Sequence, residues 1–289
     1  MPDASDAFAF CQNELKKLDP VSHFAALTAP QDNRAALMVL YAFVVNLQRI
    51  PMQVSTPEMG QIRLQWWRDI IANTNKGYGQ GCGLDNIGPL ASALKQIQKQ
   101  YHLPADQLEA MIDAREFDLA GAPMPDLASY RDYSRKTGAI TLALASQILD
   151  GGKAQHQHAE LFISAAAAIQ LCGHLLTWPQ DAERRKLFLP QEIFTRQGAE
   201  LSDILAKAQG STIEKSIEDL CSLAHEWQSD AMACLGNLPD EKRAQLLPAF
   251  LLLAQTSLIL KRRRKRPIAP ITIPHWRSYL AIWRMAAKI

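Results

Sequence analysis

Helical periodicity constrains the fold of this chain more than any other feature. Apolar residues recur three and four positions apart along most of the 289 residues, which is the spacing of one buried helix face. Runs that alternate apolar and polar residues between turn residues, the pattern of half-buried strands, are nearly absent. The sequence therefore predicts an all-α fold.

The expected helices are separated by short, frequent breaks. They occupy, in chain order, residues 6–18, 34–50, 57–74, 89–101, 104–117, 127–133, 139–149, 156–176, 191–197, 201–207, 212–235, 240–260 and 275–288. The Gly-rich stretch 76–83 and the stretch AGAPMP at 120–125 are expected to be loops, and Asp32 or Asn33 is expected to cap the second helix. Because no Pro-, Gly- or Ser-rich linker divides the chain, residues 1–289 are predicted to form a single domain of ten or more helices.

Composition excludes several classes of protein. Apolar residues make up 48% of the chain, which allows a large core, and the formal net charge of +2 provides no overall attraction to nucleic acid. No nucleic-acid partner is therefore expected. The cysteines are few, scattered and without C-x-x-C spacing: Cys11, Cys82, Cys172, Cys221 and Cys234. Such a set argues against a disulfide framework and a zinc site, and it predicts a reducing compartment.

Targeting and membrane signals are weak in this sequence. The first thirty residues have neither the apolar segment of a signal peptide nor an Arg-rich transit pattern. The most apolar late run, 249–260, is about half the ~20 residues that a membrane-spanning helix needs. We therefore expect no signal peptide or transmembrane helix, and a cytoplasmic protein with an optional peripheral position on the inner membrane face.

A basic run follows this apolar segment. It consists of Lys261, Arg262, Arg263, Arg264, Lys265 and Arg266. Adjacent charges spread around the whole circumference of a helix, so they are not all expected to be buried. The run allows contact with an anionic membrane surface, contact with a phosphate-bearing partner, or a solvated helix end whose cations suit the helix dipole.

The stretch LLTWPQDAERRKLFLP, residues 175–190, is the first candidate for chemistry. An apolar helix runs into Pro179, and the charged cluster that follows contains Asp181 and three consecutive cations, Arg184, Arg185 and Lys186. One interpretation is a charged helix end at the mouth of a cavity that holds an anion or a metal-bound anion. The other is a solvated loop between two buried helices.

Other titratable residues carry weaker signals. Asp113, Glu116 and Asp118 lie in the stretch MIDAREFDL. Positions 113 and 118 are about 140° apart around a helix, so these carboxylates are predicted to be exposed charges rather than a shared site. His174 lies within an apolar helix and has Trp178 at i+4 instead of a second ligand, which favours a hydrogen-bonded core histidine over a metal ligand.

Four stretches together resemble the squalene/phytoene synthase family. They are HFAALTAPQDNRAALMVLYAF at 23–43, GQIRLQWWRDII at 60–71, MIDAREFDL at 111–119 with Tyr133 and Gly138 after it, and IQLCGHLLTWPQDAERRKLFLP at 169–190. The resemblance extends from about residue 8 to the last helix. It implies an isoprenoid-synthase-type helical bundle around a central cavity. It also implies an activity that joins two prenyl diphosphates head to head, with Mg²⁺ between diphosphate and carboxylates.

The sequence departs from this family at the first metal-binding motif. The resemblance places Gln48, Arg49 and Met52 where that motif has aspartates. Pro51 removes a backbone donor and is expected to break the helix that presents them.

The second motif is also incomplete, because Thr177 stands in place of its first aspartate and only Asp181 remains. The stretches IRLQWWRD, RRKLFLP and LPAFL, with Trp283 and Arg284 in the last helix, resemble a branch of the family that keeps the fold without these aspartates. That branch includes a mitochondrial respiratory complex I assembly factor and bacterial relatives.

The leading hypothesis is a pseudoenzyme that binds an isoprenoid or other lipid, or that assembles a membrane-associated protein complex. No metal or other cofactor is expected. The candidate ligand or diphosphate contacts are Tyr41, Gln48, Arg49, Tyr133, Gln170, Arg184, Arg185 and Lys186.

Two alternatives remain. One is an active Mg²⁺-dependent prenyltransferase with a remodelled site. Its metal ligands would come from Asp113, Asp118, Asp181 and Glu183. In that case Asp181 and Asp118 are the catalytic candidates, and Asp181 is the candidate metal ligand. The other is a scaffold with a filled core. The small residues at 165–168 leave room for a cavity, but they equally permit close helix packing.

Overall fold

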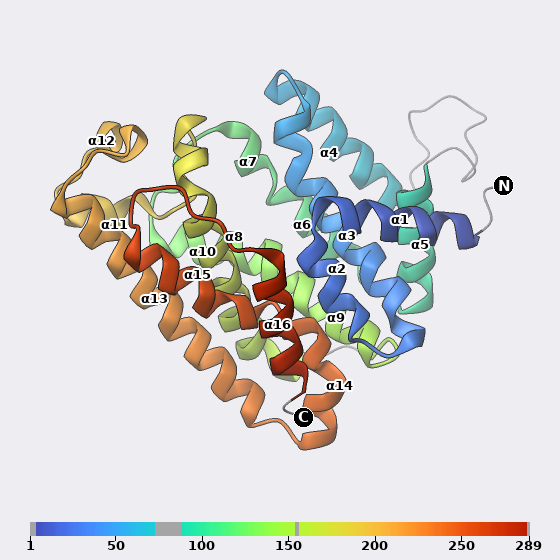
Figure 1. Ribbon diagram of the computed structural model, residues 1–289. Coiled ribbons are helices and arrows are strands. Elements are labelled where there is room, and N and C mark those ends of the chain that lie inside the picture. The colour runs from blue at the N-terminus through green and yellow to red at the C-terminus, as the bar shows by residue number, and fades with distance from the viewer. Residues whose placement is uncertain (1–3, 73–87, 154–155, 288–289) are drawn as a thin grey trace. The chain divides into compact units, whose positions relative to one another are not determined.

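The computed structural model describes residues 4–72, 88–153 and 156–287. Within these ranges the chain forms helices and no strand, so the predicted all-α class is confirmed (Figure 1). The elements are α1 Ala4–Leu18, α2 Pro20–Leu27, α3 Gln31–Gln53, α4 Pro57–Ile71, α5 Pro89–Gln100, α6 Ala105–Asp113, α7 Glu116–Ala120, α8 Leu127–Ser134, a π-helical turn Arg135–Ala139, α9 Ile140–Leu149, a 3₁₀ turn His156–His158, α10 Ala159–Glu183, α11 Gln191–Arg196, α12 Leu201–Ala206, α13 Ser211–Gly236, α14 Asp240–Phe250, α15 Leu253–Lys265 and α16 His275–Ala286.

The contacts within the chain group it into two compact units. Unit 1 consists of residues 1–120, 140–157 and 245–249, and unit 2 consists of residues 121–139, 158–244 and 250–289. The single domain expected from the sequence stays a prediction.

Unit 1 is built around α3. This helix packs against α1, α2, α5 and α9, and its middle is buried from Ala36 to Phe43. Phe43 lies edge-on to Trp67 of α4, with 4.9 Å between ring centroids. Asn33 at the start of α3 donates a hydrogen bond of 2.8 Å to the carbonyl of Ile148, the penultimate residue of α9. Apolar burial worth about 1.5–3 kcal/mol for each large side chain holds these helices together.

Unit 2 is built around α10, which packs along α13 and α15 (Figure 1). Its alanines Ala165, Ala166, Ala167 and Ala168 are all buried. Ala166 lies against the π-helical turn at Gly138. At this point the small side chains serve close helix packing.

Both ends of α3 differ from what the sequence predicted. Helix α3 continues through Pro51 to Gln53, so Pro51 does not break it. In the last turn of a helix a proline removes only one hydrogen bond, and here the helix ends two residues later. The residue before the helix is Pro30, and no side chain caps this end; the expected cap from Asp32 or Asn33 was wrong, since both residues lie within the first turn.

Three further predicted boundaries were wrong. The expected helix 104–117 is two helices, separated at Ala114 and Arg115. The expected helix 156–176 extends to Glu183 and includes Pro179, because α10 is held by its packing against α13 and α15. The expected helix 240–260 is divided into α14 and α15, which are bent by 52° just after Pro248. The predicted Gly-rich loop 76–83 lies outside the described residues.

By length and composition, two described helices, α3 and α10, could cross a membrane. The bent pair of α14 and α15 would be a third candidate if it formed one span. In this structure 61% of the apolar window of α3 and 56% of that of α10 are buried within the protein. Burial of this kind is typical of the central helix of a bundle. The expectation of no transmembrane helix stays a prediction.

Candidate functional site

A row of polar side chains runs along one face of α10 in unit 2. Gln170, His174, Thr177 and Asp181 are spaced by four, three and four residues, which places them on a single helix face. The rest of α10 is largely apolar and buried. This row is the candidate functional site of unit 2, because it combines amide, imidazole, hydroxyl and carboxylate groups on one element.

Each member of the row has a hydrogen-bond partner. Gln170 Nε2 donates to Thr137 Oγ1 over 2.7 Å, and His174 Nδ1 lies 3.0 Å from the Tyr130 hydroxyl. Thr177 Oγ1 donates to Asp181 Oδ2 over 2.7 Å. The predicted hydrogen-bonded state of His174 is therefore confirmed.

The environment of His174 is aromatic. Its ring stacks on Phe188, with 5.2 Å between ring centroids, and meets Tyr130 edge-on. Burial raises the pKa of Tyr130 well above its usual value, so this hydroxyl stays neutral. Tyr130 therefore gives the row a neutral hydroxyl partner at His174.

The π-helical turn brings two predicted contact residues into one place. Gly138 lies so close to α10 that a Cβ atom there would be 2.7 Å from Gln170 Nε2 and 2.8 Å from Ala166 Cβ. Thr137 Oγ1 donates to the carbonyl of Tyr133 over 2.7 Å, so the chain Tyr133–Thr137–Gln170 is continuous. Gln170 Oε1 is buried and accepts no hydrogen bond from the described residues. Single π-helical turns are frequent at functional sites.

The three consecutive cations lie at the C-terminal end of α10. Arg184 ends this helix, Arg185 adopts a left-handed backbone with φ 57°, and the N–H of Lys186 donates to the carbonyl of Asp181. Arg184 and Arg185 are exposed. Cations at a C-terminal end are stabilised by the negative end of the helix dipole, whereas anion sites use N-terminal ends. This geometry favours the solvated-segment interpretation, and anion binding by these residues stays a prediction.

The remaining predicted contacts lie on α3 in unit 1, Tyr41 in its middle and Gln48 and Arg49 near its end. Tyr41 is buried, and burial together with the charge of Asp19 raises the pKa of its hydroxyl. Gln48 is exposed. Arg49 is half-buried, and its Nε atom is buried without a hydrogen-bond partner among the residues that the structure describes. Met52 is 56% exposed.

Asp118 is not the exposed charge that the sequence suggested. It is buried in α7 and forms an ion pair of 3.1 Å with Arg115, each side chain being 6% exposed. The continuous helix assumed for residues 104–117 is interrupted, and this interruption turns Asp118 inward. Removing charges from water is costly unless they are paired, so this carboxylate is a poor metal ligand. Asp113 and Glu116 are exposed as predicted, and both pair with Arg68 over 2.7 Å and 2.5 Å.

The described residues do not fit the Mg²⁺ cluster that the family resemblance implies. Mg²⁺ bound to diphosphate requires carboxylate ligands, and the end of α3 provides an amide, a guanidinium and a thioether. Nowhere in the described ranges do three His, Cys, Asp or Glu side chains form a group that could hold a metal ion. No step of a reaction is therefore assigned to a metal.

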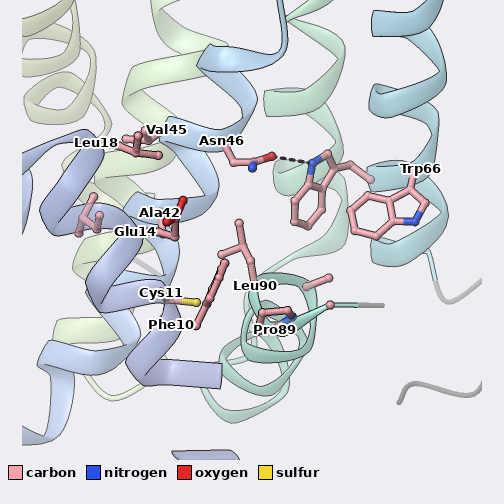
Figure 2. A pocket seen from close by; sticks show the side chains of 14 residues that line it. Phe10, Cys11, Glu14, Leu18, Ala42, Val45, Asn46, Trp66, Pro89 and Leu90 are labelled. Carbon is pink, nitrogen blue, oxygen red and sulfur yellow. Dashed lines mark hydrogen bonds between the residues drawn. The ribbon is translucent and has the colours of Figure 1, made fainter. Parts of the chain in front are cut away.

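A cavity of about 230 Å³ lies elsewhere in unit 1 (Figure 2). It is partly open, it is lined by residues of α1, α3, α4 and α5, and this lining is largely apolar. Asn46 Oδ1 accepts a hydrogen bond of 3.2 Å from Trp67 Nε1 at one side of it. None of the contact residues predicted from the sequence lines this cavity. Ala42, Val45 and Asn46 share one face of α3 and line this cavity, but their spacing alone does not mark a cavity in the sequence.

Comparison with known protein families identifies the class to which this all-α protein belongs. The family model of squalene/phytoene synthase matches residues 15–284, and the chain belongs to that family. The expected resemblance is thereby confirmed over nearly the whole chain.

Named relatives include both assembly factors and an enzyme. The chain is 25% identical to NADH dehydrogenase (ubiquinone) complex I, assembly factor 6 of Rattus norvegicus, over 98% of this chain and 84% of that protein. It is 26% identical to the Homo sapiens protein of the same name, over 90% of this chain and 75% of that protein. It is also 26% identical to presqualene diphosphate synthase of Rhodopseudomonas palustris, over 71% of each chain.

Solved structures agree on the fold. A squalene synthase from Alicyclobacillus acidocaldarius matches with a TM-score of 0.77 at 17% identity, over 94% of this chain and 98% of that one. A dehydrosqualene synthase in complex with a ligand also matches with a TM-score of 0.77, at 15% identity, over 99% of this chain and 97% of that one. The expected isoprenoid-synthase-type all-α fold is confirmed.

Proposed function

We propose that this chain is a non-catalytic member of the squalene/phytoene synthase family that acts by binding, as an assembly protein for a membrane-associated complex. One observation carries the proposal. The end of α3 presents Gln48, Arg49 and Met52 at the positions where the family resemblance places metal-binding carboxylates.

Arg49 opposes the chemistry of the enzymes in two ways. It supplies no oxygen ligand for Mg²⁺, and its permanent positive charge repels a divalent cation. The guanidinium is half-buried, where such repulsion is screened less than at an exposed position. A metal cluster at this end of α3 would therefore be destabilised.

The relatives give further support. Those named for complex I assembly match this chain over most of their own length. The 26% identity to presqualene diphosphate synthase favours the second candidate, an active prenyltransferase. The two candidates differ in their dependence on Mg²⁺, and that difference can be measured.

If the protein keeps affinity for a prenyl diphosphate, Arg49 contacts the anion directly and Mg²⁺ is not needed. We expect farnesyl diphosphate to bind equally well with Mg²⁺ and with a chelator in an isothermal titration. Arg49→Gln then weakens binding about tenfold or more, because a charge-assisted hydrogen bond is lost. The control is Arg63→Gln on α4, an exposed arginine whose side chain donates to Gln53, and it leaves binding unchanged.

Binding that appears only with Mg²⁺ would contradict this proposal and favour the enzyme. Absence of farnesyl diphosphate binding under both conditions would remove the diphosphate as ligand, while the non-catalytic assembly role would still stand. Native mass spectrometry of the purified protein then shows whether another lipid co-purifies.

A further inference from the structure

The last described helix, α16, turns an apolar stripe toward solvent. Trp276, Leu280 and Trp283 are spaced by four and three residues and share one helix face. The two tryptophans are 60% and 61% exposed. Ser278 and Ile282 on the opposite face are buried, and Ser278 Oγ donates to Gln255 Oε1 of α15 over 3.4 Å. The helix is therefore anchored by one face and leaves large apolar side chains outside.

Arginines lie beside this stripe. Arg277 and Arg284 are seven residues apart, both are exposed, and they occupy a neighbouring face of α16. The guanidinium of Arg277 lies 5.2 Å from the centre of the Trp276 ring. A helix with Trp and Leu on one face and Arg next to it is typical of helices that lie in a membrane interface.

The residues after Glu241, which include α15 and α16, carry positive charges and no negative side chain. After Glu241 the sequence contains eleven Lys and Arg residues and no Asp or Glu. Of the basic run, Lys261, Lys265 and Arg266 are exposed at the end of α15. We call these three residues the basic cluster. Of the other members of the run, Arg264 pairs with Glu218 over 3.0 Å.

Two members of the basic run serve the fold instead. Arg263 is fully buried, so the predicted lipid contact of this residue was wrong. Arg262 donates to the carbonyl of Thr272, which lies four residues before Trp276. Four residues span at most about 14 Å, so the end of α15 and the start of the apolar stripe are near each other within unit 2.

We propose that α16 docks unit 2 on an anionic lipid bilayer. Trp276, Leu280 and Trp283 enter the boundary between headgroups and acyl chains, while Arg277, Arg284 and the basic cluster contact anionic headgroups. A nucleic acid would satisfy the positive charge and leave the apolar stripe in water, whereas an anionic bilayer satisfies both. This inference goes beyond the proposed function and does not depend on it.

Vesicle co-sedimentation tests the inference. We expect the full chain to bind vesicles of phosphatidylcholine mixed with phosphatidylglycerol, and to bind phosphatidylcholine alone much more weakly. Trp276→Ser with Trp283→Ser lowers binding to the mixed vesicles about tenfold or more, because apolar burial is lost. The matched control is Met59→Ser with Ile62→Ser on α4, where the two exposed apolar side chains are 48% and 63% exposed; it binds like wild type.

The charges are tested separately. Arg277→Gln with Arg284→Gln lowers binding to the mixed vesicles about fivefold for each cation removed and changes binding to phosphatidylcholine little. A further test needs no variant and so does not depend on how a variant folds. We expect lipids with brominated acyl chains to quench the tryptophan fluorescence of the unmutated protein.

Three results would each overturn the proposal. They are no binding to the anionic vesicles, equal loss in the tryptophan and control variants, and no quenching by the brominated lipids. None of them bears on the Mg²⁺ dependence of diphosphate binding, so a failure here is distinguishable from a failure of the proposed function.

Discussion

At the scale of single residues, Arg263 shows how one charge in a basic run becomes structural. Its side chain is fully buried, and its guanidinium donates to the carbonyls of Arg266, Pro267 and Ala269 over 2.9, 3.1 and 2.9 Å. A fourth contact of 3.5 Å reaches the carbonyl of Leu176 on α10. Burial lowers the pKa of Arg263 to about 10, which still leaves it charged at neutral pH.

Arg263→Met is expected to lower the free energy of unfolding by about 2–4 kcal/mol, because the partly buried carbonyls lose their donor. Arg264→Met, its neighbour with a surface ion pair to Glu218, is expected to cost about 0–1 kcal/mol. Urea denaturation followed by far-UV circular dichroism measures both. Equal effects of the two substitutions would contradict the structural role of Arg263.

The sequence predicted the environment of some titratable side chains correctly and that of others incorrectly. His174 was recognisable because an apolar helix lacking a second ligand indicates a hydrogen-bonded histidine, and the structure supplies Tyr130. Arg263 and Asp118 were not recognisable. Their closest partners are near in the sequence, at i+3 to i+6 for Arg263 and at i−3 for Asp118. What no local pattern shows is that packing buries these charged groups.

At the scale of elements, the π-helical turn and α10 are fitted to each other. Gly138 permits the close approach of the π-helical turn to α10. The polar row of α10 can be predicted from the spacing of its residues in the sequence. The continuation of α10 through Pro179 was not readable. Pro179 cannot donate to the carbonyl of Leu175, but packing of α10 against α13 and α15 offsets that loss.

Gly138→Ala is expected to destabilise the protein by about 1–3 kcal/mol, because the new methyl group would overlap with Gln170 and Ala166. Gly173→Ala provides the control within the polar region of α10. A Cβ there meets no described atom within 4 Å, and alanine favours a helix interior by up to about 1 kcal/mol. Thermal unfolding of both variants decides the point, and a neutral Gly138→Ala would show that the contact is not tight.

At the scale of the whole molecule, the all-α class and the family were predictable because helical periodicity and four stretches that resemble the family extend over most of the chain. The cavity of unit 1 was not predictable, since it is formed by four helices whose separate patterns give no sign of the space between them. The central proposal about function rests on the end of α3, where the family resemblance places carboxylates and this chain has an amide, a guanidinium and a thioether.

The most direct test of that claim is the release of inorganic pyrophosphate from farnesyl diphosphate in the presence of Mg²⁺. The presqualene diphosphate synthase of Rhodopseudomonas palustris, run in parallel, is the positive control. We predict no release above background from the unmutated chain, and none from Asp181→Ala. Pyrophosphate release by the unmutated chain that is lost in Asp181→Ala would contradict the non-catalytic account and establish the chain as a prenyltransferase.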